Sequence, residues 1–554
     1  MVHDGAMDKE NLRTRVRATY QQGSDAVVDL VVALVGELTA QVETVATRVA
    51  VLEGENAALR VENAALRATV GTNSHNSSKP PSSDGPGIKP HPKRLRVVSG
   101  RKPGGQPGHD GHTLALVATP DEVQEHVPSH CHNCGQSLDE VAALRRERRQ
   151  VVDIPPIRAR VIEHQVVTRC CSRCGTETSG TFPPGVAAPV QYGPGVQTLA
   201  VYLTQEQLLP LARTSAVLAE VFGCPVSERT VERAVEACHE RLAAVEAAIK
   251  QGVTEAKVAH FDETGVRIDG RTSWLHGAST AHLTFYAVHQ KRGRAAMDSI
   301  GVVPRFRGRA VHDGVTSYWL YSQGTHALCN AHHLRELTFV LEHLGQGWAR
   351  DLKSLLRESK QAVDDARGQG HAALSMETQQ DLARRYDVIL DEGMQANPLP
   401  PPTGKRGRPK RGKAGSLVDR LREHKSETLA FMTDLTVPFD NNQAERDIRM
   451  TKVREKISGC FRTPAGAERF CRIRGYISTL RKQGMPIFSA LGQAIAGNPP
   501  LPVTTYPSSP STRWPKYLSG SSGLSRHFSV RGLPCDFSRR LLPYASLFKP
   551  TCTR

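Results

Sequence analysis

A seven-residue repeat of apolar side chains constrains the fold of residues 31–70 more tightly than any other feature of this chain. One seam of the repeat holds Val31, Leu38, Val45, Leu52, Leu59 and Leu66. The other seam holds Val35, Val42, Val49, Asn56, Asn63 and Val70. Branched residues in one seam, leucine in the other and a buried asparagine favour two parallel strands. The repeat therefore predicts a coiled-coil dimerisation helix over residues 26–70, and the alternative is an amphipathic helix packed on its own chain.

Two segments interrupt or end this regularity. Residues 71–113 are rich in serine, proline, glycine and asparagine and carry two basic clusters, which predicts a flexible basic linker. Its cations could follow phosphates nonspecifically, and a merely solvated linker is an equal alternative. Residues 500–554 have no apolar period and are rich in serine, proline and arginine, so we expect a disordered or aberrant C-terminal tail.

Two matching Cys-x-x-Cys-Gly sequences indicate a zinc site. The first pair is Cys131 and Cys134, and the second is Cys171 and Cys174. Four thiolates close a tetrahedral site without an open position, which predicts a structural Zn²⁺ in a domain over residues 114–185. Cys170 is an alternative ligand to Cys171, and free buried thiols are the competing interpretation of all four.

Length and charge set the wider expectations. A chain of 554 residues is too long for one hydrophobic core, so several domains are expected. The net charge of +17 favours a polyanionic partner, and nucleic acid is the expected one. We find neither an apolar run of the ~18 residues that a membrane span needs nor the pattern of a secretion signal. These features, with cysteine pairs suited to metal, predict a cytoplasmic, nucleoid-associated protein without a membrane partner.

A helical segment over residues 190–252 is a second candidate for DNA binding. Residues 209–222 and 227–238 read as two helices, separated by a Gly/Pro break and with Ser227 as the N-cap of the second. The break has the length of a helix-turn-helix corner. The second helix offers only Arg229 and Arg233 among several glutamates. A purely structural helix pair is therefore nearly as good an interpretation.

From residue 255 the apolar pattern changes to that of strands. An antiparallel meander is predicted at residues 257–262, 265–269, 272–277 and 282–289. A strand at 309–312, a helix, a strand at 325–329 and a long helix from about Ala331 follow. This order predicts a ribonuclease H-like fold over residues 255–495, with its first and fourth strands adjacent. The fold class is thus a multidomain α/β protein with an N-terminal coiled coil, a small zinc-binding domain, a helical segment and this core.

Three acidic residues in this core are candidates for catalysis. Asp262 and Asp313 each follow a predicted strand, and Glu445 lies in a helix start, Asp440-Asn-Asn-Gln-Ala-Glu-Arg446. Two carboxylates at one sheet edge and a third from a helix suit two Mg²⁺ ions and phosphoryl transfer. Singly, the three residues are better explained as a turn pair, a hairpin signal and a surface charge pair. Their combination with the strand order favours catalysis.

The remaining candidates lie between and after these acids. A helical insertion is expected at about residues 345–435, with helices over 334–367 and 378–392. Within it, Arg406 and Arg408 belong to a basic stretch that resembles an AT-hook, and a solvated loop is the alternative. Cys329-Asn-Ala-His332 resembles a metal pair without a partner knuckle, and we interpret His332 and Arg335 as phosphate contacts or as an ordinary helix start. Further cations suited to DNA backbones follow Glu445: Arg446, Arg449, Lys452 and Lys456.

Taken together, these motifs resemble the insertion sequence 66 family of DDE transposases along residues 30–500. The matching segments are residues 76–84, 101–108, the two knuckles, 260–265, 329–332, 440–446 and 475–480. The resemblance implies that Asp262, Asp313 and Glu445 form the acidic triad, that each transposon end is cut, and that its 3′-hydroxyl is joined to target DNA. The tail beyond residue 500 departs from the family pattern.

The implied partners are DNA (transposon ends and target) and a second copy of the chain bound through the zipper. Accessory proteins of the same element are candidate partners. A zinc-containing DNA-binding regulator would need the zipper and knuckles but no acids. A structure-specific nuclease would need the acids and Mg²⁺ but would not join strands.

Overall fold

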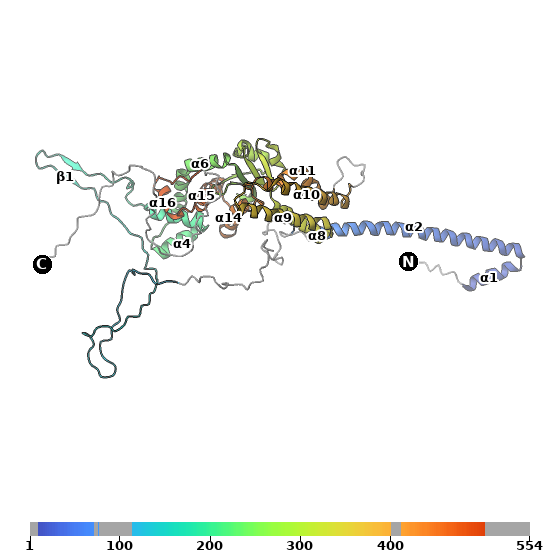
Figure 1. Ribbon diagram of the computed structural model, residues 1–554, viewed down its shortest axis with the longest axis horizontal. Coiled ribbons are helices and arrows are strands. Elements are labelled where there is room, and N and C mark those ends of the chain that lie inside the picture. The colour runs from blue at the N-terminus through green and yellow to red at the C-terminus, as the bar shows by residue number, and fades with distance from the viewer. Residues whose placement is uncertain (1–8, 71–75, 77–113, 400–410, 505–554) are drawn as a thin grey trace. The chain divides into compact units, whose positions relative to one another are not determined.

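The computed structural model describes residues 9–70, 76, 114–399 and 411–504 (Figure 1). The predicted linker, apart from Asn76, lies outside these ranges, as do Arg406, Arg408 and residues 505–554 of the predicted tail. No helix of the described residues is both long enough and apolar enough to cross a membrane.

The heptad repeat lies on one long helix. Helix α1 (Lys9–Tyr20) precedes α2 (Ser24–Val70), whose 47 residues are continuous. The seam side chains of α2 that the structure describes are exposed, with Val42 at 60% and Leu52 at 54%. Apolar side chains at this level of exposure are unusual along a helix stripe, and none of the described residues covers the seam positions up to Leu59.

The region of the cysteine pairs contains little regular structure. Strands β1 (Thr168–Cys170) and β2 (Glu177–Ser179) form an antiparallel hairpin, in which Cys170 pairs with Glu177. The turn of this hairpin contains Cys171 and Cys174. An isolated bridge between His130 and Ser137 brackets the first cysteine pair in the same way.

Helices α3 (Pro194–Val201), α4 (Leu211–Phe222), α5 (Glu228–Arg241) and α6 (Ala243–Thr254) form the predicted helical segment, with a π-helical turn at Tyr202–Glu206. The corner between α4 and α5 follows the sequence prediction. Gly223 ends α4 with a φ of 60°, and the Ser227 side chain accepts a hydrogen bond from the Thr230 amide. The inner face of α5, including Val231 and Cys238, is buried in the largest core.

The core contains one mixed five-stranded sheet in the order β5-β4-β3-β6-β7. Its strands are β3 (Val258–Ile268), β4 (Arg271–Ser279), β5 (Thr284–His289), β6 (Arg309–His312) and β7 (Thr325–Leu328). Strands β3, β4 and β5 are antiparallel, whereas β6 and β7 run parallel to β3. Strand β3, which contains Asp262, is therefore adjacent to β6, which Asp313 follows.

One strand prediction was wrong: residues 257–262 and 265–269 form the single strand β3. Its pairing with β4 runs without a break from Ile268↔Arg271 to His260↔Ser279. Its parallel pairing with β6 is much shorter and stops at His260↔Val311. The polar Asp262-Glu263-Thr264 sequence thus does not end the strand, because β4 continues to satisfy its backbone.

Helices pack on both ends of this sheet. Helix α7 (Arg294–Ile300) and a 3-10 turn at Val303–Arg305 lie between β5 and β6, and a second 3-10 turn, Thr316–Leu320, precedes β7. Helices α14 (Asn442–Ser458), α15 (Pro464–Lys482) and α16 (Ile487–Ile495) complete the core. Gly277 of β4 permits close approach of α14, because a Cβ there would lie 3.1 Å from the Ile448 side chain.

The predicted helical insertion builds a second core. Helix α8 (Asn330–Leu344) ends at Gly345, whose φ is 64°, and α9 (Gly347–Gly368) begins after it. The single helix expected over 334–367 is thus two helices, because a left-handed glycine ends the first. Helices α10 (Met376–Ala396), α11 (Lys413–Glu423), α12 (Lys425–Thr428) and α13 (Ala430–Thr433) follow. Their apolar faces pack with α8, α9 and one edge of the sheet.

Candidate active site

Asp262 lies where two neighbouring strands separate. It stands two residues beyond His260, the last residue of β3 that pairs with β6. Its Oδ1 accepts a hydrogen bond of 2.8 Å from the Glu263 amide. The carboxyl group is therefore at the end of the parallel pair but within a continuous strand, which holds it firmly.

Asp313 follows the last residue of β6, on the adjacent strand and at the same end of the parallel pair. Its Oδ1 accepts from the Val315 amide at 3.2 Å, and the turn is completed by Gly314 with a φ of 87°. His312, which is fully buried, accepts the Gly314 N–H at Nδ1. This turn exposes the second oxygen, Oδ2, 3.9 Å from the Arg292 guanidinium.

Glu445 is in the first turn of α14. Its Oε1 accepts a hydrogen bond of 3.3 Å from Arg335 on α8, and the same atom lies 3.8 Å from His332 Nδ1. Arg335 was expected to contact phosphate, and it contacts this carboxylate instead. An arginine on Glu445 and another near Asp313 partly balance the negative charge of the site.

The three acids interact electrostatically. Burial raises the pKa of Asp262 well above its ordinary value, and the negative charges of Asp313, Glu263 and Glu445 raise it further. A buried carboxyl group surrounded by like charges disfavours its own ionised form, and a bound cation removes that penalty. The carboxylate oxygens are the ligands that Mg²⁺ accepts. The residues present therefore suit a divalent metal site, although the three oxygens do not form a group within 4.8 Å among the described residues.

Asn441 connects the elements that carry these acids. Its side-chain Oδ1 accepts a hydrogen bond from His260 Nδ1 at 2.8 Å, and its Nδ2 donates to the Phe261 carbonyl at 2.8 Å, both on β3. Its backbone N–H donates to the Cys329 thiol at 3.1 Å. Asn441 is buried and directly precedes α14, so it fixes the start of the Glu445 helix against the Asp262 strand.

A fourth carboxylate lies beside the predicted triad. Glu263 is buried and accepts hydrogen bonds from the Tyr318 hydroxyl and from Arg292 Nε, the latter at 3.3 Å. Arg292 also stacks on the Trp274 ring at 4.9 Å. Sequence reasoning treated Glu263 only as part of a turn pair and did not single out Arg292, Tyr318 or Asn441. Their partners lie far apart along the chain, so no local pattern marks them.

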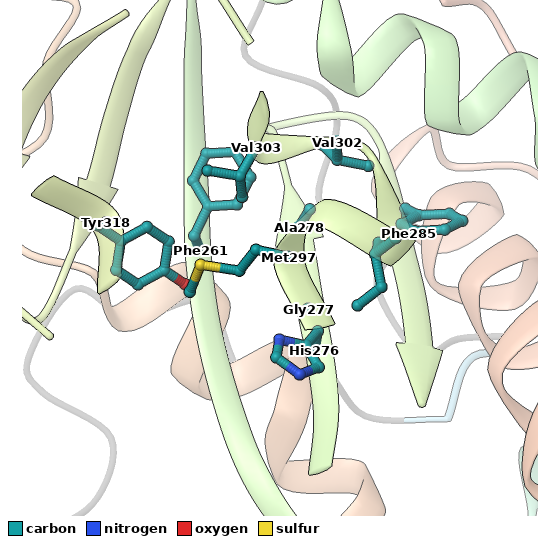
Figure 2. Close-up of a pocket in the computed structure, with 10 residues that line it drawn as sticks. Phe261, His276, Gly277, Ala278, Phe285, Met297, Val302, Val303 and Tyr318 are labelled. Atoms are coloured by element: carbon teal, nitrogen blue, oxygen red, sulfur yellow. The ribbon is translucent and has the colours of Figure 1, made fainter. Parts of the chain in front are cut away.

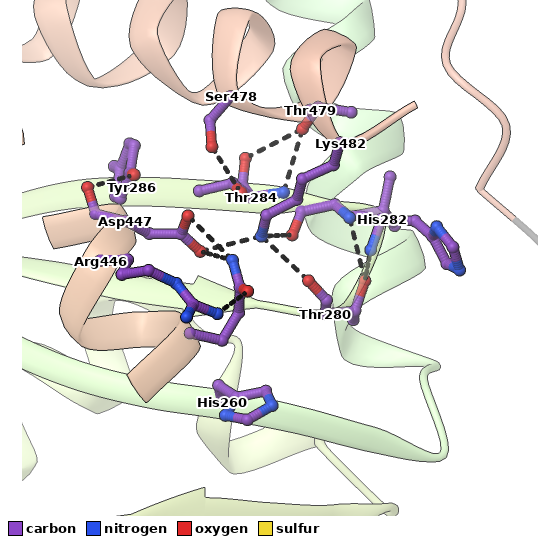
Figure 3. A network of polar contacts seen from close by, with 12 residues as sticks. His260, Thr280, His282, Thr284, Tyr286, Arg446, Asp447, Ser478, Thr479 and Lys482 are labelled. Carbon is purple, nitrogen blue, oxygen red and sulfur yellow. Dashed lines mark hydrogen bonds and ion pairs between the residues drawn. The ribbon is translucent and has the colours of Figure 1, made fainter. Parts of the chain in front are cut away.

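A polar network clamps the middle of α14 to the sheet (Figure 3). Lys482 Nζ lies 2.8 Å from Asp447 Oδ2 and donates to the carbonyls of Thr280 and Leu283 at 2.9 and 3.0 Å. The Tyr286 hydroxyl donates to the Asp447 carbonyl at 2.8 Å. The ammonium and carboxylate are both about one-tenth exposed, so each satisfies the charge of the other. The network stiffens the helix two residues beyond Glu445.

The cations predicted to bind DNA divide into two groups. Arg446, Arg449 and Lys456 are exposed on α14. Lys452, in contrast, donates to the Gly265 carbonyl of β3 and lies 3.0 Å from Glu455. Several later arginines are also engaged within the fold: Arg454 with Phe461, Arg469 with Glu236, Arg472 with Glu246 and Arg474 with Glu206.

The positive charge of Arg229, at the start of the possible recognition helix α5, is balanced by glutamates on the same helix. It lies 2.6 Å from Glu232 and 3.3 Å from Glu236 on the same helix. The same two glutamates also bind Arg469 of α15. This arrangement favours the structural interpretation of the helix pair over groove reading.

The two cysteine knuckles have the same local geometry. Gly135 donates to the Cys131 carbonyl at 2.9 Å, and Gly175 donates to the Cys171 carbonyl at 2.8 Å. Both glycines have left-handed φ values, 75° and 72°. Cys171 is the counterpart of Cys131, because each amide donates to the carbonyl five residues later, whereas Cys170 belongs to β1. Hydrogen bonds within each knuckle lower the pKa of Cys131 and of Cys174, which suits metal-binding thiolates.

Among the described residues, the atoms that gather as one metal-ligand group are those of Cys329, His332 and Glu445. The four knuckle cysteines do not form such a group across the two pairs in this part of the chain. Cys329 and His332, which resemble a metal-binding pair in the sequence, are thus joined by a third donor, Glu445, from a helix more than one hundred residues later.

A small cavity lies in the core next to the candidate site (Figure 2). Its volume is about 20 Å³, room for about one water molecule. Its wall is mostly apolar and includes Phe261, Ala278, Met297 and Tyr318. Phe261 adjoins Asp262 in the sequence, and the Tyr318 hydroxyl donates to Glu263, so two of the lining residues lie next to the site. The cavity is too small for a nucleotide, so any DNA chemistry belongs at the open side of the carboxylates.

Comparison with known families agrees with this arrangement of parts. The model of the transposase IS66 family matches residues 189–469, slightly more than half of the 554 residues. The model described as the zinc-finger binding domain of transposase IS66 matches residues 128–175. A model for a family of unknown function matches residues 28–115. No curated protein matches the chain significantly.

Proposed function

This chain belongs to the IS66 family of transposases, and we propose that it cleaves transposon ends and joins their 3′-hydroxyls to target DNA by two-metal phosphoryl transfer. The observation that carries the proposal is the electrostatic coupling of Asp262 with Asp313 and Glu445. Membership of a transposase family makes DNA the substrate, and the proposal assigns the chemistry to these three carboxylates.

The arrangement of the core supports a ribonuclease H-like assignment. The sheet has three antiparallel strands followed by two parallel ones, with β3 next to β6. This arrangement brings Asp262 and Asp313 to the same end of adjacent strands, while Glu445 approaches on a helix. The long insertion between β7 and α14 packs its helices against one edge of the sheet, where they share a core with β6 and β7.

The residues of the chain position and balance charge during the reaction. Two Mg²⁺ ions held by Asp262, Asp313 and Glu445 would supply Lewis-acid stabilisation of the attacking and leaving oxygens. Asn441 orients the Glu445 helix, and Arg335 and Arg292 hold Glu445 and Asp313 in the absence of other cations. The exposed Arg446, Arg449 and Lys456 suit DNA phosphates beside the acids.

Three further parts complete the proposal. We assign Cys131, Cys134, Cys171 and Cys174 to one structural Zn²⁺, supported by their matched turns. We assign the exposed seam of α2 to a homodimeric coiled coil. The assignment of Arg406 and Arg408 to DNA rests on their sequence alone.

Strand joining on DNA that carries the ends of the element tests the proposal. Asp262→Asn is expected to lower Mg²⁺-dependent cleavage and joining on the order of 10³-fold, because a metal ligand contributes several kcal/mol to transition-state stabilisation. DNA binding should change little. Asp269→Asn is the matched control: it makes the same substitution at an exposed turn just beyond β3.

Other outcomes identify the competing functions. Cut DNA without any joined product would identify a structure-specific nuclease. DNA binding without cuts in the wild type would identify a zinc-containing regulator. Joining that survives Asp262→Asn at the wild-type rate would remove this residue from the catalytic site. Short terminal inverted repeats around the gene would favour the transposase.

A further inference from the structure

Three different donor side chains meet where α8 begins beside α14. The Cys329 thiol, the His332 imidazole and the Glu445 carboxylate each offer one atom, and these atoms lie within 4.8 Å of one another. Cys329 is the residue just before α8, and His332 lies three residues later on its first turn. This spacing brings the two side chains to the same side of the helix start.

We propose that Cys329, His332 and Glu445 form a binding site for a single transition-metal ion of the Zn²⁺ type, with a fourth position open. A thiolate and an imidazole are poor ligands for Mg²⁺ but good ligands for Zn²⁺. Three protein ligands and one open position also differ from the closed four-cysteine site assigned to the knuckles. The proposed site therefore differs from the structural zinc site, and it shares one ligand, Glu445, with the Mg²⁺ pair.

His332 supplies the first argument. Its Nδ1 is buried and has no hydrogen-bond partner in the described structure. A buried polar atom without a partner is unfavourable unless something satisfies it. Nδ1 lies 3.8 Å from Glu445 Oε1, and metal bonds of about 2.0–2.3 Å at a tetrahedral angle separate ligand atoms by about 3.3–3.7 Å. A small movement would therefore complete the coordination.

Cys329 supplies the second argument. Its sulfur is fully buried and accepts the Asn441 N–H at 3.1 Å, a contact that also stabilises a thiolate. The residue stands at the positive end of α8, a helix of 15 residues, which favours negative charge. Burial raises the pKa of this thiol to about 12, so metal binding would release the thiol proton to solvent.

Arg335 is the competing partner for the carboxylate. It binds Glu445 Oε1 at 3.3 Å, so an incoming ion must share that oxygen or use the second one. A carboxylate has enough lone pairs for both partners. A neutral imidazole nitrogen is the form of histidine that binds metal.

Shared use of Glu445 links this site to catalysis, and this step rests on the proposed function. An ion held by Cys329 and His332 takes Glu445 from the Mg²⁺ pair. Low concentrations of Zn²⁺ should then inhibit Mg²⁺-dependent cleavage and joining by the full-length protein.

Co²⁺ binding tests the site without any assay of activity. The full-length protein is first loaded with one equivalent of Zn²⁺ for the knuckles and then titrated with Co²⁺. The wild type should take up one further equivalent with a thiolate-to-metal absorption band. Cys329→Ser, His332→Gln and Glu445→Gln should each weaken this binding about 100-fold or more, since even indirect partners of a metal contribute 10- to 100-fold.

Cys238→Ser is the matched control, because it removes another fully buried thiol that lies in a different core. It should retain the additional equivalent and the absorption band. The site would be overturned if the wild type took up no Co²⁺ beyond the knuckles, or if Cys329→Ser and Glu445→Gln bound it as the wild type does. The use of three variants protects the test against the misfolding of any one.

The ratio of joining with and without Zn²⁺ then tests the link to catalysis. Joining with Zn²⁺ should be one-tenth or less of joining without Zn²⁺ for the wild type, and the two should be about equal for Cys329→Ser. An unchanged wild-type ratio, with Co²⁺ bound, would overturn the shared use of Glu445. A wild type that joins no DNA even with Mg²⁺ would contradict the proposed function, while Co²⁺ binding would still decide the metal site.

Discussion

The ionised form of Asp262 is disfavoured both by burial and by neighbouring negative charges, and the single hydrogen bond from the Glu263 amide does not offset them. Its pKa is raised by burial first and then by the charges of Asp313, Glu263 and Glu445. The protonated carboxyl group therefore stabilises the folded state at low pH, and this contribution is lost as the pH rises above its ordinary pKa of 3.8 and through the raised value. At neutral pH the ionised group opposes folding until a cation binds.

Asp262→Asn should consequently stabilise the protein in buffer without divalent cations. The expected gain in the free energy of unfolding at pH 7 is about 0.5–2 kcal/mol, the range typical of single stabilising substitutions. The gain should shrink as the pH falls toward and below 3.8, because the wild-type carboxyl group then becomes protonated in the unfolded as well as the folded state. Urea unfolding at several pH values measures it, with Asp269→Asn expected to show no gain. An equal gain at all pH values would contradict the electrostatic explanation.

Some residues of the candidate site have a local sequence pattern that identifies them, and others do not. Asp262 and Asp313 could be proposed from sequence because each lies at the end of an apolar strand pattern, and Glu445 because it lies in a segment rich in residues that begin helices. Asn441 could not be assigned its role, because its partners at Phe261 and Cys329 are 180 and 112 residues away. Arg292 has no local signature either, since its contacts with Glu263 and Asp313 exist only after the sheet forms.

At the scale of elements, local signals were reliable where they fix backbone geometry. Ser227 caps α5, and Gly223 ends α4, as predicted. The strand boundary that was predicted wrongly depends on a neighbouring strand. Because β4 pairs continuously with β3, the polar residues within β3 do not end it. Gly345 was overlooked as the end of α8, although a left-handed glycine is a common helix terminator.

The matched knuckle turns give a prediction at this scale. Cys171→Ser should remove zinc from the purified protein, a loss of one equivalent by elemental analysis, because Cys171 occupies the turn position equivalent to Cys131. Cys170→Ser should retain that zinc, since its thiol belongs to β1 and bonds to the Gly175 carbonyl at 3.4 Å. Loss of zinc from the Cys170 variant alone would reverse the assignment of the ligand.

At the scale of the whole molecule, α2 presents a long apolar stripe that the described residues leave exposed. The heptad seams predicted the long helix, yet no sequence pattern could show whether another part of the same chain covers them. The structure leaves the seam positions Val35, Val42 and Leu52 more than half exposed. A second copy of α2 offers a matching surface, with the asparagines in register.

Val42→Glu should therefore weaken self-association, about 10- to 100-fold in the dimerisation constant, because it places a charge in the seam. Light scattering of the full-length protein over a concentration series measures the change. Val51→Glu is the matched control, since Val51 is similarly exposed on α2 but lies outside both seams. Equal effects of the two substitutions would contradict pairing through the seam.

The two ends of the insertion between β7 and α14 meet at one point. The Asn330 amide donates to the Phe439 carbonyl at 3.1 Å, and the Asn441 amide donates to the Cys329 sulfur at the same distance. An insertion whose two ends are in contact can change its length with little entropic penalty, about 0.6 kcal/mol for each doubling of its length. The outer part of this insertion, and any partner that it binds, could therefore change during evolution while Asp313 before it and Glu445 after it kept their positions.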